Sequence, residues 1–257
     1  MNIISWNVNG IRAVEKKGEF EKLIRNENPD ILLFQETKAK EDQLSGFLKK
    51  YEEYDQFYNA AEKPGYSGTA IWIKKSFEKN VSFSHGMPNF ADHEGRIARL
   101  DFDDIVIFSV YFPNGGKSEE AWEGKILFYD AFLKHINDLR KEGKHVIWAG
   151  DVNCAHEEID IARPKENENS IGFLPEERAW VSRVIEENWI DVFRKMYPEK
   201  VIYSWWHVIS RARDRNIGWR IDYVFVDEKM YSKVKEIEYV NEQMGSDHCP
   251  VKIFLDI

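Results

Sequence analysis

The chain has 257 residues, 43% of them hydrophobic, which is enough for a sizeable core in one large domain or two small ones. No stretch approaches the roughly 20 apolar residues that a membrane helix needs, and the start MNIISWNV lacks the basic and apolar regions of a signal peptide. The formal net charge of -9 argues against a general nucleic-acid binder, although a metal-dependent phosphodiesterase also needs local carboxylates.

The sequence contains two cysteines, Cys154 and Cys249. Two thiols cannot form a disulfide framework, and their wide separation argues against a zinc site. We therefore expect a protein of a reducing, intracellular compartment, the cytoplasm.

Apolar runs and amphipathic stretches alternate along the chain. Apolar runs predict strands at residues 2–8, 29–36, 68–75, 96–112 (two strands joined by a turn at Asp103–Asp104), 144–153, 220–227, 232–240 and 249–257. Helical periodicity predicts helices at residues 16–28, 40–54, 118–143 and 174–189. Ser118 can cap the third helix, Gly143 can end it, and Pro175 stands near the start of the fourth.

The mixture of α/β alternation and hairpins predicts an α/β protein with sheet layers covered by helices. Residues 163–172 are polar and rich in turn formers, which is typical of a surface loop and too short for a linker. We therefore expect one domain over residues 1–257.

Polar side chains gather where the predicted strands end. They are Asn7, Asn9, Gln35, Glu36, Tyr111, Asn114, Asp151 and Asn153. Ligand sites of open α/β sheets lie at the carboxyl ends of the strands. Carboxylates suit magnesium, and an Asp beside an Asn can orient and deprotonate a water. The pattern favours phosphoryl transfer to water.

The stretch GSDHCPV (residues 245–251) puts Asp247 beside His248. Neighbours on an extended chain point to opposite sides, so a carboxylate that orients His248 should come from elsewhere. Asp222 lies inside a predicted strand, where an isolated carboxylate is costly to bury, and it is our candidate. Each of these residues alone fits a turn, a helix cap, a core histidine or a structural ion pair. Their joint occurrence at strand ends favours a functional site.

Eight blocks of the chain, in order, carry a resemblance to a known family. They are SWNVNGIRA, PDILLFQETK, GYSGTAI, YFPNGG, GDVNCAHEEIDIARPK, GFLPEERAW, NIGWRIDY and GSDHCPV. The sequence resembles the exonuclease III family of apurinic/apyrimidinic endonucleases, in the deoxyribonuclease I-like endonuclease/exonuclease/phosphatase superfamily, over essentially its whole length. The resemblance implies a four-layer α/β sandwich in which helices flank two packed, mixed β-sheets.

The resemblance also implies a magnesium site, with manganese as a substitute. Glu36 corresponds to the metal-ligating glutamate, Asn7 sits beside the metal, and Asp247 matches a neighbour of the metal region. Asn9 stands where many members carry an Asp as a metal-site residue. A neutral amide at this position should weaken magnesium binding or leave only one strongly held ion.

The other roles follow from the same resemblance. The catalytic set implied is Asp151 to activate water, Asn153 to help it, His248 to face the phosphate, Asp222 to orient His248, and Tyr111 at the target phosphate. The substrate-binding set predicted is Asn114, Lys117, Trp205, Arg211, Arg213, Trp219 and Ile221. Lys117 occupies a position that is Arg in some members, and a Lys cannot hold a phosphate bidentately.

An abasic nucleotide has no base to unstack, so turning it out of the duplex costs less than turning out an intact one. A narrow apolar pocket of Trp205, Trp219 and Ile221 would then admit the bare sugar, unless both tryptophans are ordinary core aromatics. The basic stretch that holds Arg211, Arg213 and Arg215 would face DNA phosphates, unless it is a solvated loop.

These patterns together predict a magnesium-dependent DNA repair phosphodiesterase. It would cleave the backbone 5′ to abasic sites by in-line attack of water and also act as a 3′–5′ exonuclease or 3′-phosphodiesterase. Its partner would be double-stranded DNA with abasic sites, bound by a monomer that does not associate with membranes. One alternative is a phosphatase of the superfamily that acts on phosphoinositides, sphingomyelin or RNA tails. Another is a non-catalytic module that binds DNA or recruits partners.

Overall fold

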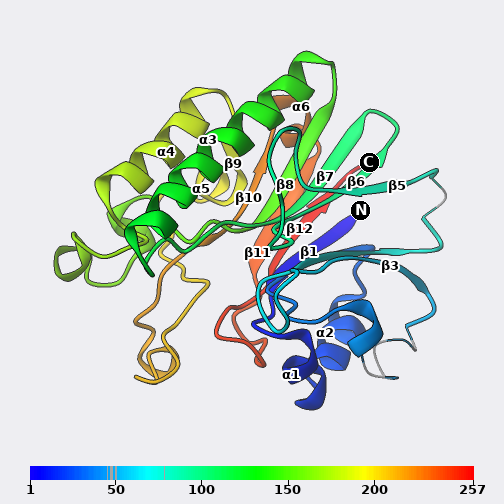
Figure 1. Ribbon diagram of the computed structural model, residues 1–257, viewed down its shortest axis with the longest axis horizontal. Helices are drawn as coiled ribbons and strands as arrows, with labels where there is room; N and C mark the ends of the chain where they lie inside the picture. The colour runs from blue at the N-terminus through cyan, green and yellow to red at the C-terminus, as the bar shows by residue number, and fades with distance from the viewer. Residues whose placement is uncertain (45, 47–48, 50, 78) are drawn as a thin grey trace.

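The computed structural model describes residues 1–44, 46, 49, 51–77 and 79–257. Its centre is a pair of six-stranded sheets (Figure 1). The first sheet has the order β11 (Val234–Tyr239), β12 (Val251–Leu255), β1 (Asn2–Asn7), β2 (Ile31–Gln35), β4 (Thr69–Lys74), β3 (Tyr54–Asn59). The second has the order β5 (Ser82–His85), β6 (Ile97–Phe102), β7 (Ile105–Tyr111), β8 (His145–Asp151), β10 (Asp222–Val226), β9 (Ile190–Asp191).

Each sheet has one parallel strand pair at its centre. β1 runs parallel to β2 and antiparallel to β12, and β8 runs parallel to β7 and antiparallel to β10. Because β1 and β2 end together, Asn7 pairs with Gln35, and the start of β10 places Asp222 opposite Asp151. The strand ends predicted to carry polar groups are therefore neighbours.

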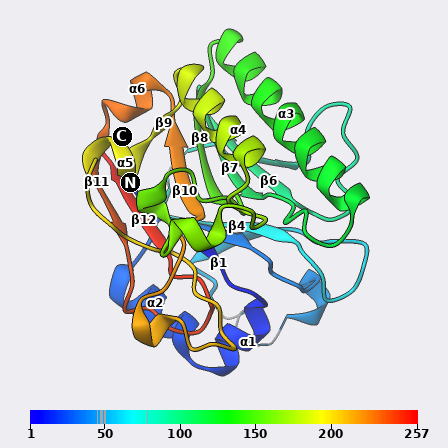
Figure 2. The same cartoon turned by 90° about the vertical axis from the view of Figure 1, so that its left-hand side faces the viewer.

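Helices cover the outer face of each sheet, so the molecule has four layers (Figure 2). The short helices α1 (Ile11–Lys16) and α2 (Glu19–Glu27) lie on the first sheet, and α3 (Glu119–Lys141) and α4 (Pro175–Glu186) lie on the second. The remaining helices are α5 (Val192–Met196), α6 (Glu228–Tyr231) and the 3₁₀ turns η1 (Glu41–Gln43), η3 (Glu158–Asp160), η4 (Pro164–Asn167) and η5 (Arg213–Arg215). The predicted four-layer α/β sandwich is confirmed.

Three apolar clusters hold these layers together. The first lies between the sheets and includes Leu33 and Ile147, the second packs α3 and α4 on the second sheet around Trp148, and the third packs α2 on the first sheet around Trp72. Burying each large side chain contributes roughly 1.5–3 kcal/mol. The strand ends project from this rigid double sheet, which fixes the groups they carry.

Most predicted elements are present, with identifiable exceptions. Ser118 caps α3 as predicted, because its Oγ accepts the N–H of Ala121 at 3.2 Å. The helix predicted over residues 16–28 is present as α2, which begins only at Glu19 because Gly18 before it has a φ of 71°; α1 was not predicted from the sequence. The helix predicted over residues 40–54 is wrong in its described part, which holds η1 and the first residue of β3; residues 45, 47–48 and 50 lie outside the described residues.

Strands β3 and β5 were not predicted from the sequence. Both lie at sheet edges, and in β5 three of the four residues are exposed, so neither contains the apolar run that reveals a buried strand. No helix within the described residues has the length and apolar character needed to span a membrane.

Candidate active site

A cleft of about 290 Å³ opens where the strand ends of the two sheets meet. Its lining consists of Glu36, Tyr111, Asn114, Asp151, Asn153, Ile171, Gly172, Trp205, Trp219, Ile221, Asp247 and His248. Most of these side chains were singled out from the sequence. Residues separated by more than 200 positions in the chain therefore share one cavity.

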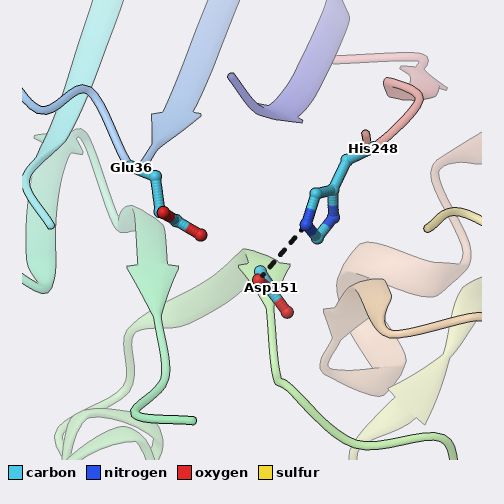
Figure 3. Close-up of side chains that lie close together, drawn as sticks. All are labelled: Glu36, Asp151 and His248. Atoms are coloured by element: carbon cyan, nitrogen blue, oxygen red, sulfur yellow. Dashed lines mark ion pairs between the residues drawn. The ribbon is translucent and has the colours of Figure 1, made fainter. Parts of the chain in front are cut away.

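Three of these side chains converge at the floor of the cleft (Figure 3). Glu36 follows β2, Asp151 ends β8, and His248 lies in the loop before β12. Each offers one ligand atom, and these atoms all lie within 4.8 Å of one another. His248 Nε2 is 3.8 Å from Asp151 Oδ2. Two carboxylates and an imidazole are thus arranged around a space that one phosphate or one cation can fill.

Asp222, the first residue of β10, orients the ring of His248, the pairing that the sequence predicted. Asp222 Oδ2 is 2.8 Å from His248 Nδ1, and both side chains are almost fully buried. Burial alone would lower the pKa of His248, but the carboxylates of Asp222 and Asp151 outweigh it and raise the pKa to about 10. The ring is therefore a cation at neutral pH, with Nε2 directed into the cleft.

Asp151 is the most buried carboxylate of the cleft. Its Oδ1 accepts the backbone N–H of Asn153 at 2.8 Å, and its Oδ2 accepts Nδ2 of Asn7 at 2.9 Å. Burial raises the pKa of Asp151 to about 7, opposed by His248 and assisted by Asp222 and Glu36. A carboxylate with this pKa can accept a proton from water near neutral pH.

Glu36 lies on strained backbone at the edge of the cleft. Its φ is 51°, a conformation that a long side chain adopts rarely and that clusters at functional sites. Glu36 Oε1 accepts Nδ2 of Asn7 at 2.9 Å, and Oε2 lies 2.8 Å from Nζ of Lys38. Burial would raise the pKa of Glu36, but Lys38 and Asn7 outweigh it and hold the pKa below its usual value. Glu36 is therefore an anion at neutral pH.

Asn7 joins the two carboxylates through one amide group. Its Nδ2 donates to both Glu36 and Asp151, and its Oδ1 accepts the N–H of Asn9 at 3.0 Å. Because its Oδ1 already accepts this hydrogen bond, Asn7 positions the two carboxylates beside the metal region. Asn9 in turn donates Nδ2 to Oδ1 of Asp247 at 2.9 Å, which brings together the four residues predicted for the metal region.

The oxygen set around Glu36 suits a hard cation. Nζ of Lys38 contacts both Glu36 Oε2 and Asn9 Oδ1, so a positive charge already fits between these oxygens. Carboxylate and amide oxygens are the ligands that magnesium and calcium prefer. His248 completes the cluster in space, but as a cation it would repel a metal ion. The oxygens of Glu36 and Asn9 therefore fit a divalent cation.

Tyr111 and Asn114 also line the cleft. Burial and the carboxylates of Glu36 and Asp151 raise the pKa of Tyr111 well above its usual value, so the phenol keeps its proton. The guanidinium of Arg96 lies 4.7 Å from the centre of the Tyr111 ring and donates to the Tyr111 carbonyl at 3.0 Å. Asn114 Nδ2 donates to Oδ1 of Asn153 at 3.1 Å.

An aromatic corner closes one end of the cleft. The rings of Trp205 and Trp219 meet edge to face with centroids 5.9 Å apart, and both pack against a small cluster that includes Ile221. Both indoles are only partly buried and line the cleft, so they are not ordinary core aromatics. Nε1 of Trp205 donates to Asp247 Oδ2 at 3.1 Å and connects this corner to the metal region.

The predicted basic contacts do not all face the cleft. Lys117 lines a neighbouring hollow of about 280 Å³, which shares Asn114 with the cleft, and Arg211 is exposed in the loop before η5. Arg213 is different, because its guanidinium donates to the carbonyls of residues 241, 243 and 246 and lies 4.5 Å from the Trp206 ring. Its donors are thus used to hold the loop that carries Asp247 and His248, not to face DNA.

Four residues of this region were not foreseen: Lys38, Arg96, Ile171 and Gly172. Ile171 and Gly172 end the loop predicted at the surface, and the available signal was that Gly172 begins the block GFLPEERAW and Ile171 directly precedes it. For Lys38 the signal was its position two residues after Glu36. For Arg96 we find no sequence signal.

Comparisons with known proteins agree with this geometry. The model of the endonuclease/exonuclease/phosphatase family matches residues 4–248. The chain is 40% identical over 258 residues to an exodeoxyribonuclease of Bacillus subtilis (strain 168), covering 100% of both chains. It is 36% identical to the DNA repair nuclease APEX1 of Danio rerio, covering 100% of this chain and 83% of that protein.

A solved structure shows the same likeness. The chain superimposes on an AP endonuclease of Leishmania major with a TM-score of 0.89 and 28% identity, covering 100% of this chain and 87% of that one. The chain therefore belongs to the endonuclease/exonuclease/phosphatase family, in the branch that holds these exodeoxyribonucleases and apurinic/apyrimidinic endonucleases.

Proposed function

We propose that this protein is a magnesium-dependent DNA repair phosphodiesterase that cleaves DNA on the 5′ side of abasic sites. The same site would trim 3′ ends as an exonuclease or 3′-phosphodiesterase. The observation that carries the proposal is the convergence of Glu36, Asp151 and His248 within 4.8 Å, beside a small aromatic corner. The names of the similar proteins, exodeoxyribonuclease and DNA repair nuclease, support the same class of substrate.

In the proposed mechanism Asp151 accepts a proton from the attacking water. Its pKa of about 7 makes it a competent base near neutral pH, and Asn7 and the Asn153 N–H fix its two oxygens. The water then attacks phosphorus in line with the 3′ oxygen, whose bond to phosphorus breaks; the departing 3′ oxygen takes a proton from solvent, and no covalent enzyme intermediate forms. The products are a 3′-hydroxyl and a 5′-deoxyribose phosphate.

Charge on the phosphoryl oxygens is stabilised from two sides. The imidazolium of His248, oriented by Asp222, donates from Nε2. The protonated phenol of Tyr111 and the amide of Asn114, which line the same cleft, are the other donors. Removing one preorganised donor of this kind typically costs about 3 kcal/mol in barrier. Asp222 holds the ring of His248 and Asn153 holds the amide of Asn114, so these two donors are positioned before the substrate binds.

Magnesium would be held by Glu36 in the region that Asn7, Asn9 and Asp247 complete. It would neutralise developing charge on the phosphoryl and leaving oxygens, and manganese has similar ligand preferences. Because Asn9 is a neutral amide, we expect one strongly held ion.

Selection of the lesion follows from the size of the cleft. We propose that the corner made by Trp205, Trp219 and Ile221 accepts the bare deoxyribose, and an abasic nucleotide is also the easiest to turn out. A repair role on chromosomal DNA implies an intracellular, cytoplasmic location. We propose a monomer, because one chain supplies both walls of the cleft.

A duplex with a single tetrahydrofuran abasic analogue tests this proposal. We expect cleavage directly 5′ to the analogue in magnesium, with a product that carries a ligatable 3′-hydroxyl, and no cleavage in EDTA. A protein that leaves this duplex intact but hydrolyses an inositol phosphate or a lipid phosphodiester would overturn the DNA repair assignment and favour a phosphatase.

A further inference from the structure

A lysine and a glutamate behind the cleft form a completely buried ion pair. Lys125 on α3 and Glu177 on α4 both have 0% side-chain exposure, and Nζ of Lys125 contacts Oε1 of Glu177. Taking two charges out of water is expensive, and well-packed apolar residues often serve a core as well or better. The other contacts of the pair suggest what it does.

Lys125 holds the backbone of two cleft residues. Its Nζ donates to the carbonyl of Asn153 at 2.9 Å and to the carbonyl of Asn114 at 3.2 Å, so its three donors are all used. One helical turn further, Tyr129 donates its hydroxyl to the carbonyl of Val152 at 3.1 Å. Helix α3 thus fixes the chain after β7 and after β8, where these strands deliver their functional groups.

Glu177 holds a third segment of the wall. Its Oε2 accepts the N–H groups of Gly172 at 2.7 Å and Leu174 at 2.9 Å. Gly172 has a φ of 91°, and a Cβ there would lie 2.9 Å from Cζ3 of Trp219, so its backbone packs directly on the aromatic corner. The position of Gly172 therefore limits the space beside Trp219.

We propose that Lys125 and Glu177 act as a positioning pair for the reaction at this cleft, an inference that rests on the function proposed above. The pair touches no substrate. Its hydrogen bonds fix the backbone of Asn114, Asn153 and Gly172. The backbone N–H of Asn153 in turn donates to Oδ1 of Asp151 and so fixes this carboxylate. Shifts of about 1 Å in such positioning groups can cost on the order of 100-fold in rate.

The competing explanation is that the pair only joins α3 to α4. Removing Lys125 alone would strand the carboxylate of Glu177 in the interior and endanger folding. The informative variant is therefore Lys125→Met with Glu177→Gln, which removes both charges and leaves an amide oxygen to accept the N–H groups of Gly172 and Leu174. Lys125→Arg keeps the charge and the donors. Leu133→Ala, a buried position on the same helix, is the control for lost stability.

Steady-state kinetics on the abasic duplex separate the two explanations. We expect the double variant to lose about 30- to 100-fold in kcat, with KM within about threefold of wild type. Lys125→Arg should recover kcat to within about fivefold of wild type. Leu133→Ala should lower Tm at least as much as the double variant, yet keep kcat within about twofold. Equal losses of kcat in Leu133→Ala and in the double variant would overturn the proposal.

A second readout does not depend on catalysis. The side-chain amide resonances of Asn114 and Asn153 should shift or broaden in the double variant, while those of Asn59, which is bound to Asp92 and to the Ile97 carbonyl, should stay in place. Unchanged amides at positions 114 and 153, or changed amides with kcat within about threefold of wild type, would each overturn the positioning role. A wild-type protein that leaves abasic DNA intact would instead overturn the proposed function, and the amide resonances would still report whether the pair positions the cleft.

Discussion

At the scale of single residues, the protonation of Asp151 and His248 sets the pH range of the proposed reaction. The base must be ionised, and burial raises the pKa of Asp151 to about 7. The phosphate donor must be protonated, and the carboxylates of Asp222 and Asp151, against the effect of burial, raise the pKa of His248 to about 10. Activity should therefore rise as pH increases through about 7, stay high, and fall as pH increases through about 10.

Substitution of Asp222 tests the origin of the upper limit. In Asp222→Asn the largest charge that stabilises the His248 imidazolium is gone, so the pKa of His248 falls. The descending limb of kcat/KM against pH should move to lower pH, while the ascending limb should move no higher, because the same carboxylate also raises the pKa of Asp151. A descending limb that stays at its wild-type position would show that it does not report His248.

Loss of either group should be severe on its own. His248→Asn removes a charged donor, which corresponds to about 3 kcal/mol or roughly 150-fold in kcat. Asp151→Asn removes the base and should cost roughly 100- to 10,000-fold. Single-turnover cleavage of an abasic duplex measures both, and turnover within about tenfold of wild type in either variant would contradict the assigned roles.

The sequence predicted the pairing of His248 with Asp222 but not the pair Lys125 and Glu177. The first prediction required only the two-residue alternation of a strand and the cost of burying a lone carboxylate. Lys125 lies on the apolar stripe of α3, in register with Phe128 and Phe132, and this was the available signal. A lysine on a long helix is nonetheless exposed by default, and its buried partner on α4 is set by packing that the local sequence does not encode.

At the scale of elements, hydrogen bonds from residues 206–213, before β10, hold residues 241–247, before β12, in place. Three backbone carbonyls between residues 241 and 246 accept the guanidinium of Arg213, and the backbone N–H of Trp206 donates to the carbonyl of Asp247 at 3.1 Å. The two segments carry the aromatic corner and His248. We therefore expect that a change which displaces one of these segments also displaces the other.

A pair of arginine variants tests this dependence. Arg213→Met leaves three carbonyls without their donor, so it should lower Tm and reduce kcat for abasic cleavage at least tenfold. Arg211→Met, two residues away and exposed, should keep Tm and kcat and weaken DNA binding with a smaller salt dependence. If the two variants were interchangeable in Tm and kcat, the link between these segments would be refuted.

Element prediction succeeded where burial produces an apolar run and failed where it does not. The central strands β2, β7 and β8 are buried on both faces, so their sequences are mostly apolar. The edge strand β3 has a mixed composition, YDQFYN, that carries no such signal. The periodicity at residues 40–54 favoured a helix, but in the described part of this range Glu41–Gln43 form η1 and Tyr54 pairs with Lys74 of β4.

At the scale of the whole molecule, an acidic protein is proposed to act on a polyanion. The net charge is -9, so binding of DNA must rely on local charge, through Lys117, Arg211 and the cation proposed near Glu36, against general repulsion. The two packed sheets make this possible, because each brings a carboxylate and a donor to one cleft: Glu36 and His248 from the first sheet, and Asp151 and Tyr111 from the second.

Metal removal separates binding from chemistry at this scale. In EDTA we expect no cleavage of an abasic duplex, while gel-shift binding of the same duplex persists with a Kd within about tenfold of the value in magnesium. Cleavage should return on addition of magnesium or manganese. Full activity in EDTA would contradict a metal-dependent mechanism, and binding without cleavage under any metal would favour a non-catalytic DNA-binding module.

The most direct test of the central claim is a cleavage panel of matched duplexes that contain an abasic site, a uracil, a mismatch or no damage, each titrated with magnesium. We predict magnesium-dependent incision directly 5′ to the abasic site, at a kcat/KM at least 100-fold above the internal cleavage of the other three duplexes. Equal incision of all four duplexes, or incision independent of magnesium, would contradict the claim that one metal-binding cleft selects and cleaves the abasic nucleotide.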